Sequence, residues 1–196
     1  MRAVSVITPS IPSRRELLVE ARRSVADQTV PVHHLIDDHP DRPVAEKRNR
    51  LIRAADTEWV AFLDDDDLLD SIHVETLLGH DADVVVPFCR FSGPPLAPVN
   101  CCAGYYNRPY DRDDLRQHGI FPITVLARRD AILGAGGFGD GIYEDWDLWN
   151  AMADAGATFE VVPTVTWTYR RTGAGRSRPR LWRQREILSQ VLRRIR

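Results

Sequence analysis

The N-terminal half of the chain alternates between short β-branched apolar runs and stretches in which apolar residues recur at helical spacing. This alternation constrains the fold more than any other feature of the sequence. Strands separated by helices form a mostly parallel sheet with helices on both faces. We therefore predict an α/β, Rossmann-like fold with strands at 3–8, 32–36, 58–63 and 83–88, and with helices after Ser13, at about 44–55 and near 71–79.

The second half of the sequence is less regular. Residues 89–118 contain several prolines and glycines, and we expect an irregular excursion or a hairpin there. A strand and a short helix are expected over 121–133, and the glycine-rich loop GAGGFGDG at 134–141 lacks the P-loop pattern. A helix over 143–156 and two strands, at 158–162 and 164–170, are predicted to follow.

Two local signals predict helix ends. Ser13 and Glu16 are spaced as in a capping box, which would begin the first helix. Gly156 follows the last apolar position of the 143–156 helix and is a candidate C-cap.

The length of the chain favours a single compact domain. Its 196 residues, 43% of them hydrophobic, suffice for one well-formed core and are few for two. No apolar run approaches the roughly 18 residues that a membrane span requires, and the start, MRAVSVITPSIP, does not resemble a signal peptide. Three cysteines without a CxxC pair indicate a reduced compartment, so we expect a cytoplasmic protein.

Four consecutive acids, Asp64 to Asp67, directly follow an apolar strand-like run. Two carboxylates about 4 Å apart repel each other by on the order of 4 kcal/mol at an effective dielectric constant of about 20. Alternate residues of an extended chain share a face, so Asp64 and Asp66 are expected to converge and to bind a divalent cation such as Mg²⁺. The alternative is that the acids point to water and that Asp67 or Asp70 caps the next helix.

Polar groups also follow the first two predicted strands, as Pro9-Ser10 and Asp37-Asp38. The carboxyl ends of parallel strands lie at one edge of a sheet, which is where ligands of such folds bind. We therefore expect these residues to gather beside the acidic run.

Charge is unevenly distributed along the chain. The net charge is −2, but the residues from Arg170 onward include ten arginines and one acid, and residues 1–169 include 16 bases and 27 acids. The tail 178–196 is predicted to be a basic amphipathic helix opened by Pro179. It would contact a polyanion, either nucleic acid or an anionic membrane surface, or dock on the acidic body.

Four segments in order make the sequence similar to the family 2 glycosyltransferases, which have the GT-A fold. They are VSVITPS, LIDDH, AEKRNRLIRAADTEWVAFLDDDD with its Arg-Asn pair and D-x-D strand, and FPITVLARRDAILGAGGFGDGIYEDWDLW with its Glu-Asp pair. The resemblance covers nearly the whole chain, as far as TYRRTG. It implies a GT-A domain over 1–177, with a nucleotide-sugar-binding half at 1–88 and an acceptor-side half at 89–177, followed by the basic helix 178–196.

The resemblance also implies roles on the donor side. Asp38 would hydrogen-bond the nucleobase, Arg48 would contact the base or the phosphates, and Asp65 would face the ribose. The donor-binding residues implied in this way are Pro9, Ser10, Asp38, Arg48, Asp64 and Asp65.

For the metal, the resemblance implies Asp66 as the ligand, with Asp64 as a second candidate, and Mn²⁺ or Mg²⁺ as the ion. For catalysis it implies inversion at the anomeric carbon, with Asp145 as the base and Glu144 beside it. The chemistry agrees, because the leaving diphosphate must be neutralised and the attacking hydroxyl must lose a proton. The macrodipole at a helix start would favour the ionised form of Asp145.

One departure from the family concerns the loop after the predicted strand 164–170. The family often has a histidine there, where this sequence has Thr172, so a third protein ligand from this loop is not expected. Arg170, Arg171 or Arg176 would neutralise phosphate instead.

The expected activity is metal-dependent transfer of a sugar from a nucleotide-sugar donor, UDP-linked in most of the family, to an acceptor hydroxyl. The acceptor is a polymeric or lipid-linked glycan, a small molecule or a modified DNA base, and peripheral contact with a membrane fits the basic tail. Two alternatives of another class stay open, namely a non-catalytic nucleotide-sugar or nucleic-acid binding module and a metal-dependent phosphoesterase. The phosphoesterase would leave YEDWDLW, which contains Asp145, without a role.

Overall fold

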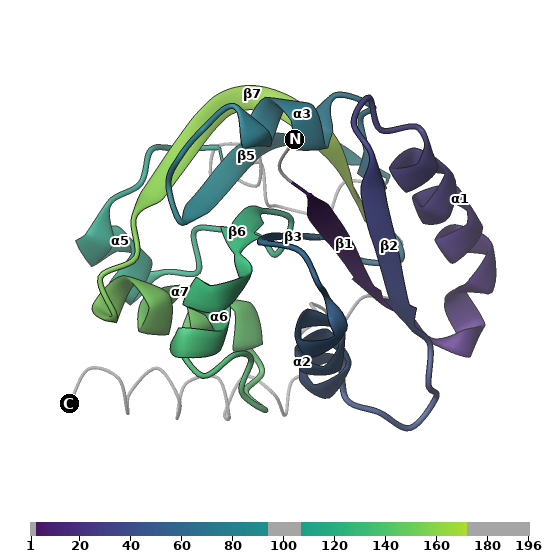
Figure 1. The fold of residues 1–196 in the computed structure, drawn as a ribbon, viewed down its shortest axis with the longest axis horizontal. Coiled ribbons are helices and arrows are strands. Elements are labelled where there is room, and N and C mark those ends of the chain that lie inside the picture. The colour runs from purple at the N-terminus through teal and green to yellow at the C-terminus, as the bar shows by residue number, and fades with distance from the viewer. Residues whose placement is uncertain (1–2, 94–106, 172–196) are drawn as a thin grey trace.

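A curled, seven-stranded mixed sheet organises residues 3–93 and 107–171, the part of the chain that the computed structural model describes (Figure 1). The order of the strands is β2-β1-β3-β6-β5-β7-β4. Their bounds are β1 Val4–Pro9, β2 Val32–Asp37, β3 Trp59–Phe62, β4 Leu68–Leu69, β5 Val84–Ser92, β6 Leu126–Arg128 and β7 Phe159–Arg170. The predicted α/β class is confirmed, and the first four predicted strands correspond to β1, β2, β3 and β5.

The pairing of the strands is parallel in the N-terminal part of the sheet and mixed beyond it. β1 lies parallel to β2 and β3, and β5 lies parallel to β7. β6 runs antiparallel to both β3 and β5, and β4 runs antiparallel to β7. A parallel pair requires a crossover that returns the chain to the starting edge of the sheet. The chain enters β6 without such a crossover, so β6 pairs antiparallel with β3 and β5. The sheet is therefore less parallel than the sequence predicts.

The helices cover both faces of the sheet, as expected. Alternate residues of β3 define the two faces, because Trp59 and Ala61 belong to one buried cluster and Val60 and Phe62 to another. The first cluster contains side chains of α1 (Arg15–Ala26) and α3 (His73–Leu78). The second contains side chains of α2 (Val44–Ala54), α5 (Arg112–Gln117), α6 (Arg129–Gly134) and α7 (Glu144–Asp154).

One predicted helix end is confirmed and the other is wrong. Gly156 has φ +89°, and the N–H of Ala157 donates to the carbonyl of Met152 at 3.0 Å, which is the Schellman arrangement that ends α7. At the start of α1, Ser13 lies inside a 3-10 turn, η1 (Pro12–Arg14), and the helix shows no side-chain cap hydrogen bond. Pro12 starts the helical turn before Ser13, so Ser13 does not have the extended backbone of an N-cap.

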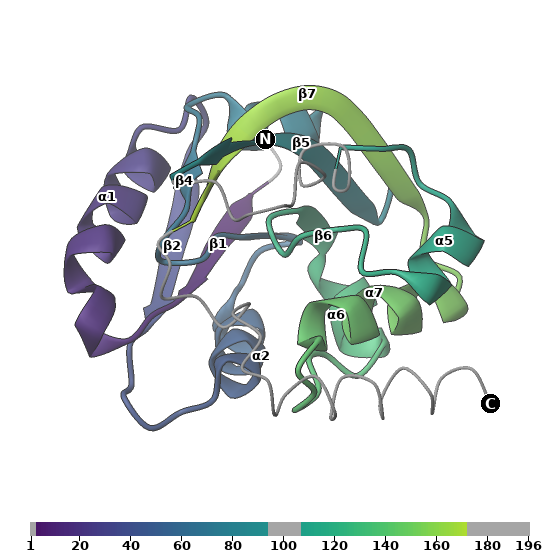
Figure 2. The same ribbon diagram turned by 180° about the vertical axis from the view of Figure 1, so that it is seen from behind.

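β7 is a single long strand where the sequence predicts two. It arches across the whole molecule in Figures 1 and 2, with its C-terminal part beside β4. The register of its pairing with β5 shifts between the pairs Pro87–Val162 and Phe88–Val165. Pro163 falls in this irregularity, where the missing N–H of a proline breaks no ladder hydrogen bond. β4 is a strand that the sequence analysis does not predict.

Two predicted features fall on residues outside the described ranges. These are the basic helix 178–196 and most of the irregular excursion at 89–118, namely residues 94–106. Within the described ranges, every helix is too short or too polar to span a bilayer.

Candidate active site at the carboxyl ends of the central strands

The carboxyl ends of β1, β2 and β3 meet at one edge of the sheet, as the parallel pairing requires. The N–H of Ser10 donates to the carbonyl of Asp37 at 2.9 Å, which joins the ends of β1 and β2. The Ser10 hydroxyl donates to Asp65 Oδ2 at 2.8 Å, which joins the end of β1 to the acidic run after β3. The three polar strand ends predicted from the sequence therefore form one site.

The acidic run is a tight turn, which we call the acidic turn (residues 64–67). The N–H of Asp67 donates to the carbonyl of Asp64 at 3.1 Å. Asp65 is buried and points toward β1, where its carboxylate accepts from Ser10, from the Ile11 N–H at 3.3 Å and from Arg14 at 2.8 Å.

The other three acids of the turn converge. Asp64, Asp66 and Asp67 each place a carboxylate oxygen within 4.8 Å of the others. The alternation rule of an extended strand brings Asp64 and Asp66 together but misses Asp67, because the chain turns after Asp64 and carries Asp67 back to them. Three converging carboxylates are a donor set suited to a hard divalent cation.

Two carboxylates of the acidic turn, those of Asp66 and Asp67, have raised pKa values although arginines lie close to the turn. Burial, and then the charge of Asp64, raise the pKa of Asp66, although Arg14 lies 3.0 Å away. The same two causes raise the pKa of Asp67 well above its ordinary value, although its carboxylate accepts a 2.8 Å hydrogen bond from the Arg170 N–H. A bound divalent cation would favour the ionised carboxylates, so the residues fit a metal.

Of the paired aspartates at the end of β2, Asp37 is structural. It is buried, accepts hydrogen bonds from the guanidinium of Arg42 and accepts from the His39 N–H at 3.1 Å. Burial opposes its ionisation, but these hydrogen bonds outweigh that effect and lower its pKa. Asp38, the predicted nucleobase ligand, is exposed at the same edge, and Pro9 is the buried last residue of β1.

Lys47 is a buried cation that the sequence analysis misses. Its side chain is only 2% exposed, and Nζ donates to the Ser10 carbonyl at 2.5 Å. Burial lowers its pKa, and the charges of Asp37 and Asp65 oppose that effect. The signal was present in the sequence, because Lys47 and Arg48 share a helical face with Val44 and Leu51.

Arg48 connects the acidic turn to the start of α7. Its Nη2 donates to Asp64 Oδ1 at 2.6 Å, and its Nη1 donates to Glu144 Oε1 at 2.9 Å. Arg48 is 3% exposed, and its guanidinium lies 5.3 Å from the ring centroid of Phe138.

The glycine-rich loop is held by the residue after Arg48. The Asn49 amide accepts from the Phe138 N–H at 2.8 Å and donates to its carbonyl at 2.7 Å. Gly137 has φ +73°, and a Cβ there would lie 2.6 Å from Asn49 Oδ1. Gly137 thus permits a close approach of this loop to α2.

Asp145, the predicted base, lies half-buried in the first turn of α7. Burial, and then the charge of Glu144, raise its pKa to about 6, with Arg48 opposing. The helix macrodipole is expected to favour the ionised form of Asp145, but desolvation outweighs that effect even though the Trp146 N–H donates to Asp145 at 2.8 Å. A carboxylate with this pKa is ionised at neutral pH and is a strong enough base to accept a proton.

Two of the arginines expected to neutralise phosphate are described. Arg170, the last residue of β7, donates from Nε to the Asp66 carbonyl at 2.5 Å and pairs with Glu20. Arg171 lies over the ring of Phe91, with 4.8 Å to the centroid. Arg176 and Thr172 lie outside the described residues.

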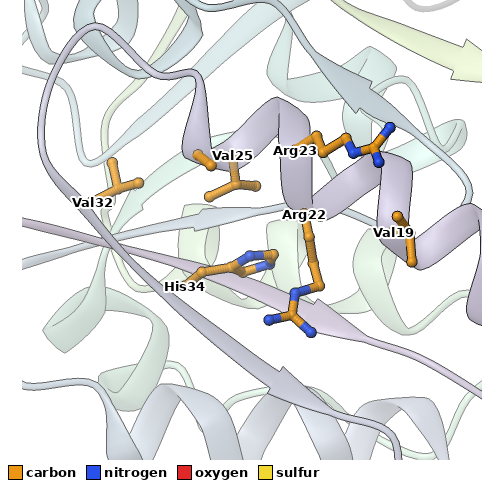
Figure 3. A pocket seen from close by; sticks show the side chains of 7 residues that line it. Val19, Arg22, Arg23, Val25, Val32 and His34 are labelled. Atoms are coloured by element: carbon orange, nitrogen blue, oxygen red, sulfur yellow. The ribbon is translucent and has the colours of Figure 1, made fainter.

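A hollow of about 550 Å³ lies elsewhere, between α1 and β2 (Figure 3). Apolar side chains, Arg22 and Arg23 of α1, and His34 line it, and no member of the acidic turn does. The chemistry described above therefore lies outside this hollow.

No family model matches the chain, and no curated protein matches it. Solved structures do. TarS residues 1–349 from S. aureus, in complex with UDP-GlcNAc, superpose with a TM-score of 0.68 at 14% identity, covering 92% of this chain and 62% of that one. The mannosyltransferase PcManGT from Pyrobaculum calidifontis, in complex with GDP-Man and Mn²⁺, gives 0.69 at 18% identity, covering 93% and 60%.

This likeness identifies the fold, which is the GT-A type of α/β fold that the sequence resemblance implies. The chain spans about 60% of the length of these two structures.

Proposed function

We propose that the chain is a metal-dependent, inverting glycosyltransferase that moves a sugar from a nucleotide-sugar donor to an acceptor hydroxyl. The observation that carries this proposal is the connection, through Arg48, between the acidic turn and the start of α7, where Asp145 lies. This connection supports the proposal that the candidate cation-binding set and the candidate base belong to one site at the carboxyl ends of the strands. The GT-A type of fold, shared with TarS and PcManGT, supports the same function.

The donor nucleotide would lie over the ends of β1 and β2. Asp38, which is exposed, would bind the nucleobase, and Pro9 and Ser10 would lie beside it. Asp65 would face the ribose, and Asp64 would border the phosphates. TarS is in complex with UDP-GlcNAc and PcManGT with GDP-Man, so we propose a UDP-sugar first and a GDP-sugar second, with dTDP-sugars also open.

The cation, Mn²⁺ or Mg²⁺, would be held by Asp66 with Asp64, and the geometry adds Asp67 as a third candidate ligand. When bound, it would neutralise the leaving diphosphate as a Lewis acid. The Arg170 side chain, packed against the acidic turn, adds a positive charge at the same edge.

The transfer step requires the acceptor hydroxyl to attack the anomeric carbon from the face opposite the diphosphate. The bond from the acceptor oxygen to this carbon forms as the bond to the diphosphate breaks, which inverts the configuration. Asp145 would take the proton of the hydroxyl during the attack. The buried residues around it, such as Trp146, would limit access of water to the reacting carbon.

The acceptor class rests on the sequence alone. A glycan, a lipid-linked acceptor, a small molecule and a modified DNA base all fit, and the tail that would contact a polyanion lies outside the described residues. The cytoplasmic and peripheral-membrane expectations likewise stay predictions.

Two measurements test the proposal. Calorimetry should show that UDP or GDP binds more tightly in Mn²⁺ than in EDTA, and a donor-hydrolysis assay should show release of the nucleoside diphosphate from its sugar. Metal-dependent binding with no release from any nucleotide sugar would favour the binding-module alternative. Phosphate release from simple phosphate esters would favour the phosphoesterase.

A further inference from the structure

Arg48 joins two elements that lie far apart in the sequence. Its two terminal nitrogens bind Asp64, 16 residues later, and Glu144, 96 residues later. The first partner belongs to the acidic turn in the nucleotide half, and the second begins α7 in the acceptor half. One side chain of α2 therefore sets the distance between the two halves of the candidate site.

We call the ion pairs of Arg48 with Asp64 and Glu144 the Arg48 bridge. The charges of this bridge depend on one another. Arg48 and Glu144 are both buried, with exposures of 3% and 7%. A buried charge is tolerated when it is paired and hydrogen-bonded, and removal of one partner leaves the other uncompensated. Without Arg48, the Glu144 carboxylate would remain beside Asp145 with its ion pair lost, and these like charges would separate.

The bridge also occupies the groups that a ligand would need. Both terminal nitrogens of Arg48 already face carboxylates, and its guanidinium is packed against the Phe138 ring. A contact with a nucleobase or a phosphate would require one of these ion pairs to break. This arrangement disagrees with the donor contact that the family resemblance implies for Arg48.

We propose that Arg48 is a positioning residue that holds Glu144, and through it Asp145, in register with the acidic turn, and that it is not a donor ligand. This inference rests on the glycosyltransferase function proposed above. Asn49 reinforces the register, because its hydrogen bonds to Phe138 fix the loop that leads into α7. Loss of the bridge displaces the base and leaves the nucleotide site in place.

The test compares nucleotide binding with turnover in Arg48→Met, which keeps an unbranched apolar side chain and removes the guanidinium group. Arg53→Met, an exposed change on the same helix, is the matched control. For Arg48→Met we expect the affinity for UDP or GDP with Mn²⁺ to stay within about threefold of wild type. We expect kcat for donor hydrolysis to fall by about 100-fold, as misplacement of a catalytic group gives. An affinity loss as large as the kcat loss would make Arg48 a donor ligand. If neither the nucleotide affinity nor kcat changed, Arg48 would have no positioning role.

Two further variants keep the test decisive if Arg48→Met unfolds. Arg48→Lys keeps the charge but cannot present a planar fork to two carboxylates, so it should show the same split between binding and kcat. Arg48→Met combined with Glu144→Gln removes the stranded carboxylate and should recover most of the Tm without recovering kcat. Recovery of kcat as well as Tm would show a purely structural role.

The failure of this inference can be told from the failure of the proposed function. Wild-type protein with no nucleotide binding and no turnover would refute the function. The bridge would still be tested by the Tm losses of Arg48→Met, Glu144→Gln and the double variant, which are strongly non-additive if the pair is coupled and additive if it is not.

Discussion

Within the described residues, the predicted nucleotide-sugar-binding half (1–88) buries Asp37, Lys47, Arg48, Asp65 and Asp67, whereas the predicted acceptor-side half (89–177) buries Glu144 as its one acidic or basic side chain other than histidine. Glu144 itself contacts the nucleotide half, through Arg48. The acceptor half is instead held by aromatic packing, as in the stacked rings of Tyr110 and Phe159 at 4.9 Å.

Under the proposed function, this difference divides substrate binding and proton transfer between the two halves. Burial of a charge is costly unless partners are supplied, and the nucleotide half supplies them at the strand ends, where a polyanionic donor and a cation would bind. The acceptor half brings one acidic pair to the candidate site, Glu144 and Asp145, on a well-packed helix. Binding and proton transfer should therefore be separable by mutation.

The largest expected effect comes from a mutation in the acceptor half that removes proton transfer and leaves nucleotide binding intact. Asp145→Asn keeps the shape of the side chain and removes the proton acceptor, so kcat for donor hydrolysis or transfer should fall by roughly 100-fold or more. Nucleotide affinity with Mn²⁺ should be unchanged, as calorimetry would show. Asp140→Asn, an exposed change in the loop before α7, is the control. A near-wild-type rate in Asp145→Asn would reduce this residue to a helix-start role.

The second-largest effect comes from a mutation in the nucleotide half that removes metal-dependent nucleotide binding. Asp66→Ala should abolish the gain in UDP or GDP affinity that Mn²⁺ gives, a loss of roughly tenfold or more, because metal sites lose at least that much when even indirect partners of the ligands are removed. In EDTA its Tm should equal or exceed that of wild type, because like charges are relieved. Asp56→Ala, at an exposed carboxylate, is the control. Equal affinity in EDTA and Mn²⁺ for the wild-type protein would remove the metal from the mechanism.

The pH dependence sharpens the comparison further. The folded pKa of Asp145, about 6, lies above its ordinary value, so the protonated form is favoured by folding. The contribution of Asp145 to the free energy of unfolding is therefore fully present below about pH 4 and is lost as the pH rises through 6. Asp145→Asn should therefore raise Tm at pH 7.5 and change it little at pH 4. In the wild type, kcat should fall tenfold per pH unit below about 6. A flat profile from pH 5 to 8 would contradict the assignment.

The smallest effect concerns the contact between the halves. Gly137→Ala places a Cβ at positive φ and 2.6 Å from the Asn49 amide oxygen, so unfolding free energy should fall by about 1–3 kcal/mol. Gly139→Ala is the matched control, because no atom lies within 4 Å of the position that its new methyl group would take and its φ is not positive. Denaturant titration of both variants gives the difference. Equal stability would show that the loop is not fixed by α2.

The sequence predicts the main elements of the fold and the meeting of the strand ends, because both follow from local periodicity and from parallel pairing. It does not predict that Asp67 joins Asp64 and Asp66, since a tight turn replaces the extended chain that the alternation rule assumes. It also misses β4, whose two residues are defined by their pairing with β7 and have no pattern of their own.

The contacts of Arg48 show the same limit. The sequence places it beside the candidate site, but its two carboxylate partners come from distant elements, and no local pattern reports such a contact. The pKa of Asp145 could not be predicted for a related reason. The macrodipole is a property of the helix alone, whereas desolvation depends on everything packed around it.

The hydrogen bond from the Arg170 N–H to Asp67 has a practical consequence for protein engineering. It fixes the end of β7 against the acidic turn, and the Arg170 side chain also donates to the Asp66 carbonyl. A peptide tag or linker inserted directly after Arg170 would therefore begin beside two candidate metal ligands. An assay of this protein should carry no insertion at this position.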